Sequence, residues 1–311
     1  MTCIAIVGGT GLVGRALIET ARAQGHRLRI AVRSHTPDWL LQLSQAAAGD
    51  CTTFSWQGGD APFPGDEVRG CDALINLAGA SIGDGRWTAR RRELLRSSRI
   101  DTTVSLAAIC RDASIPVLVN ASGVAIYGLH AGEVDEEAPA HGEDFLAQLA
   151  QDWEAAALQA APTTRVVLLR LGMVLSGQGS ALQRIVPPWL PRFVPLVPLA
   201  GGRQGLPWIH LDVAASMLLA AATDAAWRGA VNGVAPDVAT NAAFTRAAAA
   251  ASGHFYFPLG PPALALRVAL GRQADLVLAD IRAIPKRAQA WNFAWRWPNL
   301  AMALENCLGN S

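Results

Sequence analysis

Short apolar segments alternate with longer amphipathic ones through the first half of the chain. A segment that is apolar throughout suits a strand buried on both faces of a parallel sheet, and apolar residues three or four apart suit a helix. The expected strands are Cys3–Val7, Leu28–Val32, Thr52–Ser55, Ala73–Leu77, Val117–Ala121 and Val166–Leu169. The expected helices are Leu12–Ala23, Trp39–Ala47, Ala89–Arg111 and Asp144–Ala160. This alternation predicts an α/β fold with a parallel sheet.

The pattern changes after Arg170, where prolines and glycines divide the chain into short pieces. A strand followed by a helix is expected at Trp208–Ala222, a strand near Val231–Val234 and a helix near Asn241–Ala251. The last fifty residues contain three short helical patterns, and alternating aromatic residues lie between the last two at Trp291, Phe293, Trp295 and Trp297. They line a binding groove or pack the last helix, and their alternation suits a half-buried strand. We expect a nucleotide-binding domain over 1–170, to which the segment 205–236 could return. A smaller lobe over 171–311 would carry the substrate, with an extension from about 255.

Three glycines, Gly8, Gly11 and Gly14, follow the first expected strand and open the first expected helix. The first permits a tight turn, the second lets the backbone approach a pyrophosphate, and the third lets the helix pack against the strand. A glycine-rich turn without a ligand is the alternative. The strand–loop–helix context instead favours a dinucleotide site in a Rossmann-like, doubly wound fold. The residues assigned to it here are Gly8, Thr10, Gly11, Leu12, Val13 and Gly14.

The end of the second expected strand discriminates between the two nicotinamide cofactors. An NAD site usually places a carboxylate there to bind the ribose 2′-OH. This chain instead has Arg33 followed by Ser34, a cation and a hydroxyl group suited to a 2′-phosphate. A solvent-facing arginine is the alternative. The missing acid and the added cation together favour NADP over NAD.

Charge and composition narrow the class of protein further. The chain has 26 basic and 25 acidic side chains and a net charge of +1. Nucleic-acid-binding domains are usually clearly basic, so this balance argues against that class of protein. Five scattered cysteines favour a reducing compartment, and six histidines show no metal-ligand spacing. No apolar run reaches the ~18 residues of a membrane span. We therefore expect a cytoplasmic protein with a small-molecule substrate and with no metal, nucleic acid or membrane; the sequence does not indicate its oligomeric state.

Several motifs resemble those of the extended short-chain dehydrogenase/reductase superfamily. They are Asn76–Gly79, with Ala78 and Gly79 on the adenine side of the cofactor, the fifth strand with its loop over Val117–Gly128, and Trp208–Asp212. A narrower set is similar to an atypical subfamily, the epimerase-family or sugar-nucleotide-epimerase-like proteins. It comprises Arg86–Thr88, Ser98–Ile100, Trp153–Glu154, Asn232–Pro236, Thr240–Asn241, Leu270–Gly271 and Ile284–Pro285. This resemblance covers essentially the whole chain and implies an NAD-dependent epimerase/dehydratase domain followed by a segment of unknown function.

The chemistry implied by the superfamily rests on a Ser or Thr and on a Tyr-x-x-x-Lys pair, in which the lysine lowers the pKa of the tyrosine. This chain has two tyrosines, Tyr127 and Tyr256, and a single lysine, Lys286. Neither tyrosine precedes the lysine by four residues, so the pair is absent. The usual hydroxyl position falls on Gly123, with Ser122 beside it. The departure puts any epimerase activity in question.

Some residues remain as candidates for chemistry. Tyr127 is a replacement acid/base or a packing residue, and Ser122 orients a substrate oxygen or satisfies its own loop. His210 and Asp212 either face the substrate or, in the case of the aspartate, cap a helix. Arg86 and Arg99 either clamp a cofactor phosphate or belong to a solvated basic face. Three hypotheses follow: an NADP-dependent reductase- or epimerase-like oxidoreductase with a non-standard acid/base, a non-catalytic NADP(H)-binding regulatory or partner-stabilising protein, and a structural protein with a vestigial fold.

Overall fold

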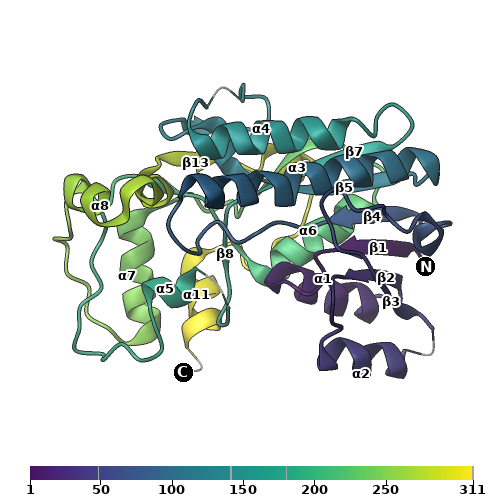
Figure 1. Cartoon of the computed structure of the whole chain (residues 1–311). Coiled ribbons are helices and arrows are strands. Elements are labelled where there is room, and N and C mark those ends of the chain that lie inside the picture. Colours follow the sequence, from purple (N-terminus) through teal and green to yellow (C-terminus); the bar gives the residue numbers. More distant parts are fainter. Residues whose placement is uncertain (48, 141, 180, 310–311) are drawn as a thin grey trace.

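Seven parallel strands form the central sheet, in the order β11-β7-β5-β4-β1-β2-β3 (Figure 1). The strands are β1 Cys3–Val7, β2 Arg27–Val32, β3 Cys51–Ser55, β4 Ala73–Asn76, β5 Val117–Gly123, β7 Arg165–Leu171 and β11 Gly229–Gly233. The computed structural model describes residues 1–47, 49–140, 142–179 and 181–309. The strand order reverses between β1 and β4, and doubly wound folds bind ligands at the carboxyl ends of the strands beside such a reversal.

Helices cover both faces of the sheet, as the unbroken apolar strands require. The first face carries α1 (Leu12–Ala23), α2 (Asp38–Ala46) and α6 (Leu211–Thr223), and the second carries α3 (Ala89–Asp112) and α4 (Phe145–Leu158). Figure 1 shows α3 and α4 side by side above the sheet, with α1 and α2 below it. Side chains of one strand alternate between the two cores: Ile4 and Ile6 join the first, Ala5 and Val7 the second. The chain therefore has the Rossmann-like α/β fold that its sequence predicts.

Most of the remaining elements form a smaller lobe at the carboxyl ends of the strands. Its short strands are β6 Gly132–Val134, β8 Met173–Leu175, β9 Gly205–Leu206, β10 Trp208–His210, β12 Ala239–Thr240 and β13 Ile281–Ala283, paired as β6–β13, β8–β10 and β9–β12. Its helices are α5 Leu182–Ile185, α7 Asn241–Ser252, α8 Ala263–Leu270, α9 Asp275–Leu278 and α11 Leu300–Leu308. Helix α10 (Lys286–Ala290) instead packs beside β11, and its Ala288 joins the first core of the central sheet. Helices α7 and α11 pack together around a core of their own that includes Phe244 and Leu304. Short 3₁₀ helices at Gly65–Val68, Val124–Tyr127 and Gly271–Ala274 complete the described elements.

The alternating aromatic segment near the C-terminus corrects one expectation. The four aromatic side chains are half-buried, as predicted, but no strand forms there. Trp291 packs on Trp227 with ring centroids 5.2 Å apart, and Phe293 packs on the same ring at 5.6 Å. Between them Asn292 has a φ of +54°, which is not a strand conformation. The alternation arises because every second side chain packs on the first core while no neighbouring strand offers hydrogen bonds.

Candidate functional site

A cleft of about 350 Å³ opens beside the carboxyl ends of β1, β2 and β4, next to the reversal of strand order. It brings together seven of the residues that the sequence assigns to the cofactor: Gly8, Thr10, Gly11, Arg33, Ser34, Ala78 and Gly79. No carboxylate occurs among the described residues that line it. The cleft therefore has the location and the lining that a dinucleotide requires in this fold.

The glycine loop lines this cleft with backbone atoms, because its glycines carry no side chains. Gly8 has a φ of +82°, and a Cβ atom on it would lie 2.6 Å from the carbonyl carbon of Leu77. Gly11 is the N-cap of α1, yet no side chain caps that helix. The N–H groups of the first turn, at Leu12, Val13 and Gly14, are therefore not capped by a side chain and can bind an anion. Gly14 is buried against Gly8 and Gly9, where a side chain would collide with the backbone.

The far end of the cleft lies where β2 and β3 end. Arg33 and Ser34 are exposed there, and the Arg33 carbonyl accepts hydrogen bonds from the side chains of Ser55 and Gln57. His35 and Trp56 also line this end, although sequence reasoning did not select them. Trp56 follows β3 directly, so the rule that ligands bind at the carboxyl ends of parallel strands could have pointed to it.

Arg99 does not line the cleft, although the sequence offered it as a phosphate clamp. Its guanidinium is buried under Gly79 and donates to the carbonyl oxygens of Ala80 and Leu95 at 3.0 and 3.1 Å. It also lies 5.0 Å from the ring of Trp153. Burial lowers the pKa of Arg99 to about 10. Arg99 thus supports the turn after β4 from below and does not itself line the cleft.

Arg86 is exposed in the loop between β4 and α3 and is also outside the residues that line the cleft. The turn at Ala78 is held more directly by Asn76, whose side-chain oxygen accepts from the Ala78 N–H at 3.0 Å. The Asn76 amide in turn donates to Asn120 at 2.7 Å and to Thr103 at 2.9 Å. Buried amides with every group paired fix the end of β4 relative to β5 and α3.

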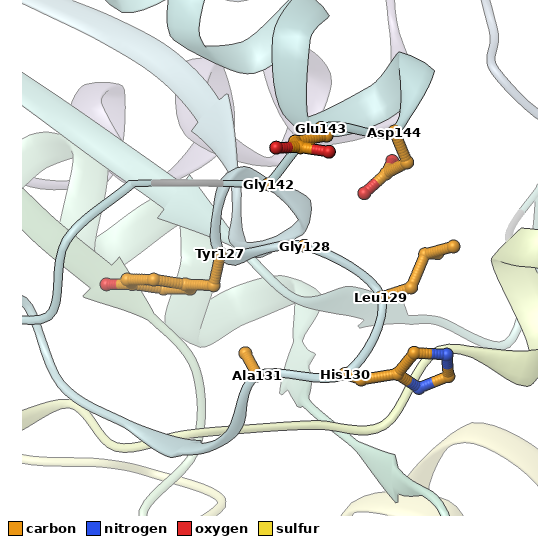
Figure 2. Close-up of a pocket in the computed structure, with 8 residues that line it drawn as sticks. All are labelled: Tyr127, Gly128, Leu129, His130, Ala131, Gly142, Glu143 and Asp144. Carbon is orange, nitrogen blue, oxygen red and sulfur yellow. The ribbon is translucent and has the colours of Figure 1, made fainter.

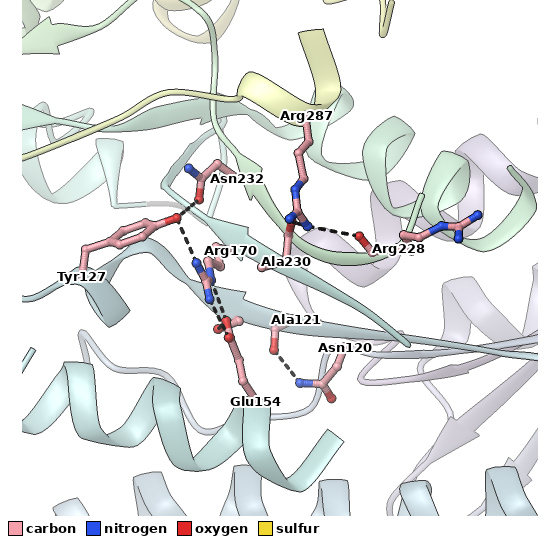
Figure 3. A network of polar contacts seen from close by, with 10 residues as sticks. Asn120, Ala121, Tyr127, Glu154, Arg170, Arg228, Ala230, Asn232 and Arg287 are labelled. Atoms are coloured by element: carbon pink, nitrogen blue, oxygen red, sulfur yellow. Dashed lines mark hydrogen bonds and ion pairs between the residues drawn. The ribbon is translucent and has the colours of Figure 1, made fainter. Parts of the chain in front are cut away.

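A buried ion pair occupies the region beyond the cleft, at the ends of β5 and β7 (Figure 3). Arg170 donates to both carboxylate oxygens of Glu154, at 2.9 and 2.8 Å. Ser122 donates to the same carboxylate at 2.7 Å. Burial alone would lower the pKa of Arg170, but the Glu154 carboxylate more than offsets this and raises it. The bidentate geometry is the strong form of a salt bridge. The hydroxyl of Ser122 is engaged by its own hydrogen bond to this carboxylate.

The hydroxyl of Tyr127 completes this network. It accepts from Arg170 at 3.0 Å and donates to the side-chain oxygen of Asn232 at 2.8 Å. Only 6% of Tyr127 is exposed. Its backbone borders a surface depression lined by Gly128, Leu129, His130, Ala131, Gly142, Glu143 and Asp144. Figure 2 shows the ring directed away from the two carboxylates of that depression.

Burial raises the pKa of Tyr127, and Arg170 offsets only part of that effect. We expect a Tyr256→Phe variant, which leaves Tyr127 as the single tyrosine, to ionise above the ordinary tyrosine pKa of about 10. Ultraviolet difference absorbance during a pH titration measures this ionisation. The unfolded chain releases the proton first, so this group contributes a loss of stability as the pH rises above about 10. A midpoint at or below the ordinary value would contradict the prediction, because burial would then not outweigh the effect of Arg170 on this pKa.

His210 and Asp212 lie away from the cleft. The Nδ1 atom of His210 accepts from the Asp212 N–H at 3.2 Å, so the histidine and not the aspartate caps α6. Burial lowers the pKa of His210, whose other ring nitrogen contacts Asn306 at 3.1 Å. Asp212 instead accepts from the Trp297 indole at 3.4 Å. Both side chains therefore attach the C-terminal segment to α6, and the expected cap by Asp212 is wrong.

The only lysine of the sequence, Lys286, also links two segments of the chain. Lys286 contacts Asp135 at 2.9 Å and Glu137 at 2.8 Å, and this joins α10 to the chain after β6. The side chain is half exposed, and its partners are these two carboxylates and not Tyr127. No group of three or more metal-ligating side chains occurs within the described ranges. None of the described helices is long and apolar enough to cross a membrane.

The fold, the uncapped helix and the glycine-lined cleft define a nucleotide-binding protein of the short-chain dehydrogenase/reductase type. Residues 4–232 match the NAD dependent epimerase/dehydratase family, and residues 261–307 match a domain of unknown function, DUF1731. The chain belongs to the NAD dependent epimerase/dehydratase family, and it is NAD(P)-binding.

Individual relatives agree with this assignment. An epimerase family protein of Mycobacterium leprae is 35% identical over 97% of this chain and 94% of its own length. The crystal structure of human epimerase family protein SDR39U1 with NADPH has a TM-score of 0.83 and 30% identity, covering 99% of this chain and all of that one. A nucleoside-diphosphate sugar epimerase from Corynebacterium glutamicum has a TM-score of 0.74 and 26% identity, covering all of this chain and 59% of that one.

Proposed function

We propose that this protein binds NADP(H) in preference to NAD(H) and uses it in a reductase- or epimerase-like hydride transfer on a small molecule. The observation that carries the proposal is the lining of the cleft. Arg33 and Ser34 stand at the end of β2, and no described lining residue is a carboxylate that could bind a free 2′-OH. The NADPH bound to the human relative supports the same choice.

The residues of the cleft fit each part of this cofactor. The uncapped N-terminus of α1 and Gly11 would hold the pyrophosphate, Arg33 and Ser34 the 2′-phosphate, and Trp56 the adenine end. The cofactor supplies the hydride chemistry when bound. The turn at Ala78 and Gly79, supported by Asn76 and Arg99, would position the cofactor toward the end of β5.

An Arg33→Ala variant tests the cofactor preference. Loss of a hydrogen-bonded charge costs about 1.5–3 kcal/mol, so we expect NADPH affinity to fall about 10- to 100-fold. Affinity for NADH should stay within about twofold, because NADH has no phosphate for Arg33 to bind. Isothermal titration with each nucleotide measures both values. Arg69→Ala, an exposed arginine outside the cleft, is the matched control. An equal loss for NADPH and NADH in Arg33→Ala would contradict the proposal.

A specific observation also favours a second candidate, a non-catalytic NADP(H)-binding protein that regulates or stabilises a partner. The hydroxyl groups of Ser122 and Tyr127, the two candidates for proton transfer, already make hydrogen bonds inside the buried network. Stereospecific hydride exchange from labelled NADPH distinguishes the two candidates. Exchange into any of a panel of small aldehydes, ketones and sugar nucleotides excludes the non-catalytic one. Its absence, with NADPH still bound, excludes the first.

A further inference from the structure

The outer end of the smaller lobe exposes large apolar side chains on two segments that run side by side. Trp189 and Phe193 are 77% and 78% exposed on the first segment, and Phe255 and Leu259 are 71% and 73% exposed on the second. The backbone of Leu196 bonds to that of the second segment on both sides of Tyr256. The exposed side chains of the two segments therefore belong to one surface, which we call the aromatic face.

Helix α8, which follows the second segment in the chain, also exposes large apolar side chains. Only Leu266 of this helix is buried, whereas Leu264 and Val268 are 74% and 81% exposed. Figure 1 shows α7 and α8 at the end of the molecule opposite α2. Monomeric proteins seldom concentrate so many protruding apolar side chains, and such patches mark interaction sites.

The charge on the same two stretches of chain is strongly one-sided. Residues 181–211 and 238–274 contain no aspartate or glutamate and six arginines, all of them exposed: Arg184, Arg192, Arg203, Arg246, Arg267 and Arg272. The rest of the chain keeps 20 basic and 25 acidic residues, a net charge of −5. Two of these arginines pair with carboxylates outside the two stretches, Arg184 with Asp84 and Arg267 with Asp275. Even when these two carboxylates are counted, six positive charges against two leave the outer end of a nearly neutral chain with a positive balance.

The arginines are interleaved with the apolar side chains. Arg192 lies between Trp189 and Phe193 in the sequence, and its side chain passes beside Gly253 on the second segment. The guanidinium of Arg246 lies 5.0 Å from the ring of Tyr256. Arg267 precedes Val268 on α8 and contacts Asp275 at 3.7 Å. Aromatic side chains among cations are the combination that enters the interface of an anionic bilayer.

We propose that the aromatic face docks this protein on the surface of an anionic phospholipid membrane. Side chains that are more than 70% exposed project from the protein, so they suit insertion among lipids better than contact with a preformed groove. A second copy of the chain would bring six further arginines against the first six. The expectation of no membrane contact rests on the lack of an apolar run long enough to span a bilayer, and peripheral docking needs no such run. The absence of a membrane-spanning helix among the described helices therefore does not bear on the proposal. The proposal is independent of the nucleotide site.

Vesicle flotation with the full chain tests the proposal. We expect the protein to float with vesicles of phosphatidylglycerol and phosphatidylcholine at low salt, and not with phosphatidylcholine alone. The double variant Trp189→Ser/Phe193→Ser should bind at least about tenfold more weakly, because two aromatic side chains no longer leave water. Arg246→Gln and Arg272→Gln should each weaken binding about fivefold.

The control is Leu94→Ser/Leu158→Ser, which removes two apolar side chains that are 46% and 49% exposed on α3 and α4. It should float as the unchanged protein does, and the melting temperature of every variant should confirm folding. The proposal is overturned by absence of flotation with anionic vesicles, by equal flotation with neutral ones, or by unchanged flotation of the Trp189/Phe193 variant. It is also overturned if sedimentation shows a dimer that only this variant dissociates.

Discussion

Replacing Glu154 by glutamine should lower the free energy of unfolding by about 3–5 kcal/mol. The side chains of Glu154 and Arg170 are only 7% and 8% exposed, so the substitution leaves a buried cation without its counter-charge. The hydrogen bond from Ser122 to the carboxylate is weakened at the same time. A domain is stable by only about 5–15 kcal/mol, so the loss is a large fraction of the total. Urea denaturation followed by circular dichroism measures it.

The same helix offers a matched control. Asp152 pairs with Arg96 at 2.7 Å, but both side chains are more than 40% exposed. Asp152→Asn should therefore cost at most about 1 kcal/mol. Replacing both buried partners by apolar residues, as Glu154→Leu/Arg170→Met, should recover most of the loss, because no charge is then left unpaired. A cost for Glu154→Gln no greater than that for Asp152→Asn would show that the pair does not stabilise the fold.

A Gly8→Ala variant should be destabilised by about 2–5 kcal/mol and should not bind NADPH. An alanine at a φ of +82° is strained, and its Cβ atom would lie 2.6–2.8 Å from the backbone of Leu77 and Ala78. Relief of that collision moves the β4 turn, which is one wall of the nucleotide cleft. Thermal denaturation with and without NADPH measures both effects, because a ligand that binds only the folded state raises its stability.

Alanine variants of two other glycines serve as controls for Gly8→Ala. Gly25→Ala tests backbone strain without a collision, and Gly11→Ala tests contact with the ligand without either. Gly25 has a φ of +74° with nothing within 4 Å of an added Cβ, so Gly25→Ala should cost only about 1 kcal/mol. An added Cβ on Gly11 would lie 3.4 Å from the Gly8 carbonyl oxygen, an ordinary contact. Gly11→Ala should therefore fold normally and lose NADPH affinity. If Gly8→Ala were as stable as Gly25→Ala, the collision with the turn after β4 would not contribute to the loss of stability.

Short sequence patterns were sufficient to predict the strands and the cofactor cleft of the nucleotide-binding part of the protein. Apolar runs marked the strands, and the three glycines marked the turn after β1. The carboxyl ends of neighbouring parallel strands meet at one edge, so Gly8, Arg33 and Ala78 line one cleft although they are far apart in sequence. The role of Arg99 could not be predicted in this way, because the residue type does not reveal whether the guanidinium faces the cleft or lies under the turn beside it. Packing under Gly79 decided this.

The buried network was beyond sequence reasoning for a related reason. Arg170 within the apolar run of β7 signals that a partner must exist, because an unpaired buried charge is too costly. That partner, Glu154, comes from α4, while Ser122, Tyr127 and Asn232 come from β5, the 3₁₀ helix after it and β11. No spacing along the chain relates these elements. Their distances depend on how α4 packs on the sheet and on the order of its strands.

The sequence by itself determined the parallel α/β fold, the family and the glycine loop, because each depends on short-range periodicity or on contiguous motifs. It also determined that the Tyr-x-x-x-Lys pair is absent, since two tyrosines and one lysine leave no place for it. Only the tertiary structure decided what those residues do instead. It buries the hydroxyl of Tyr127 between Arg170 and Asn232 and holds Lys286 between two carboxylates, because long-range packing sets which side chains meet.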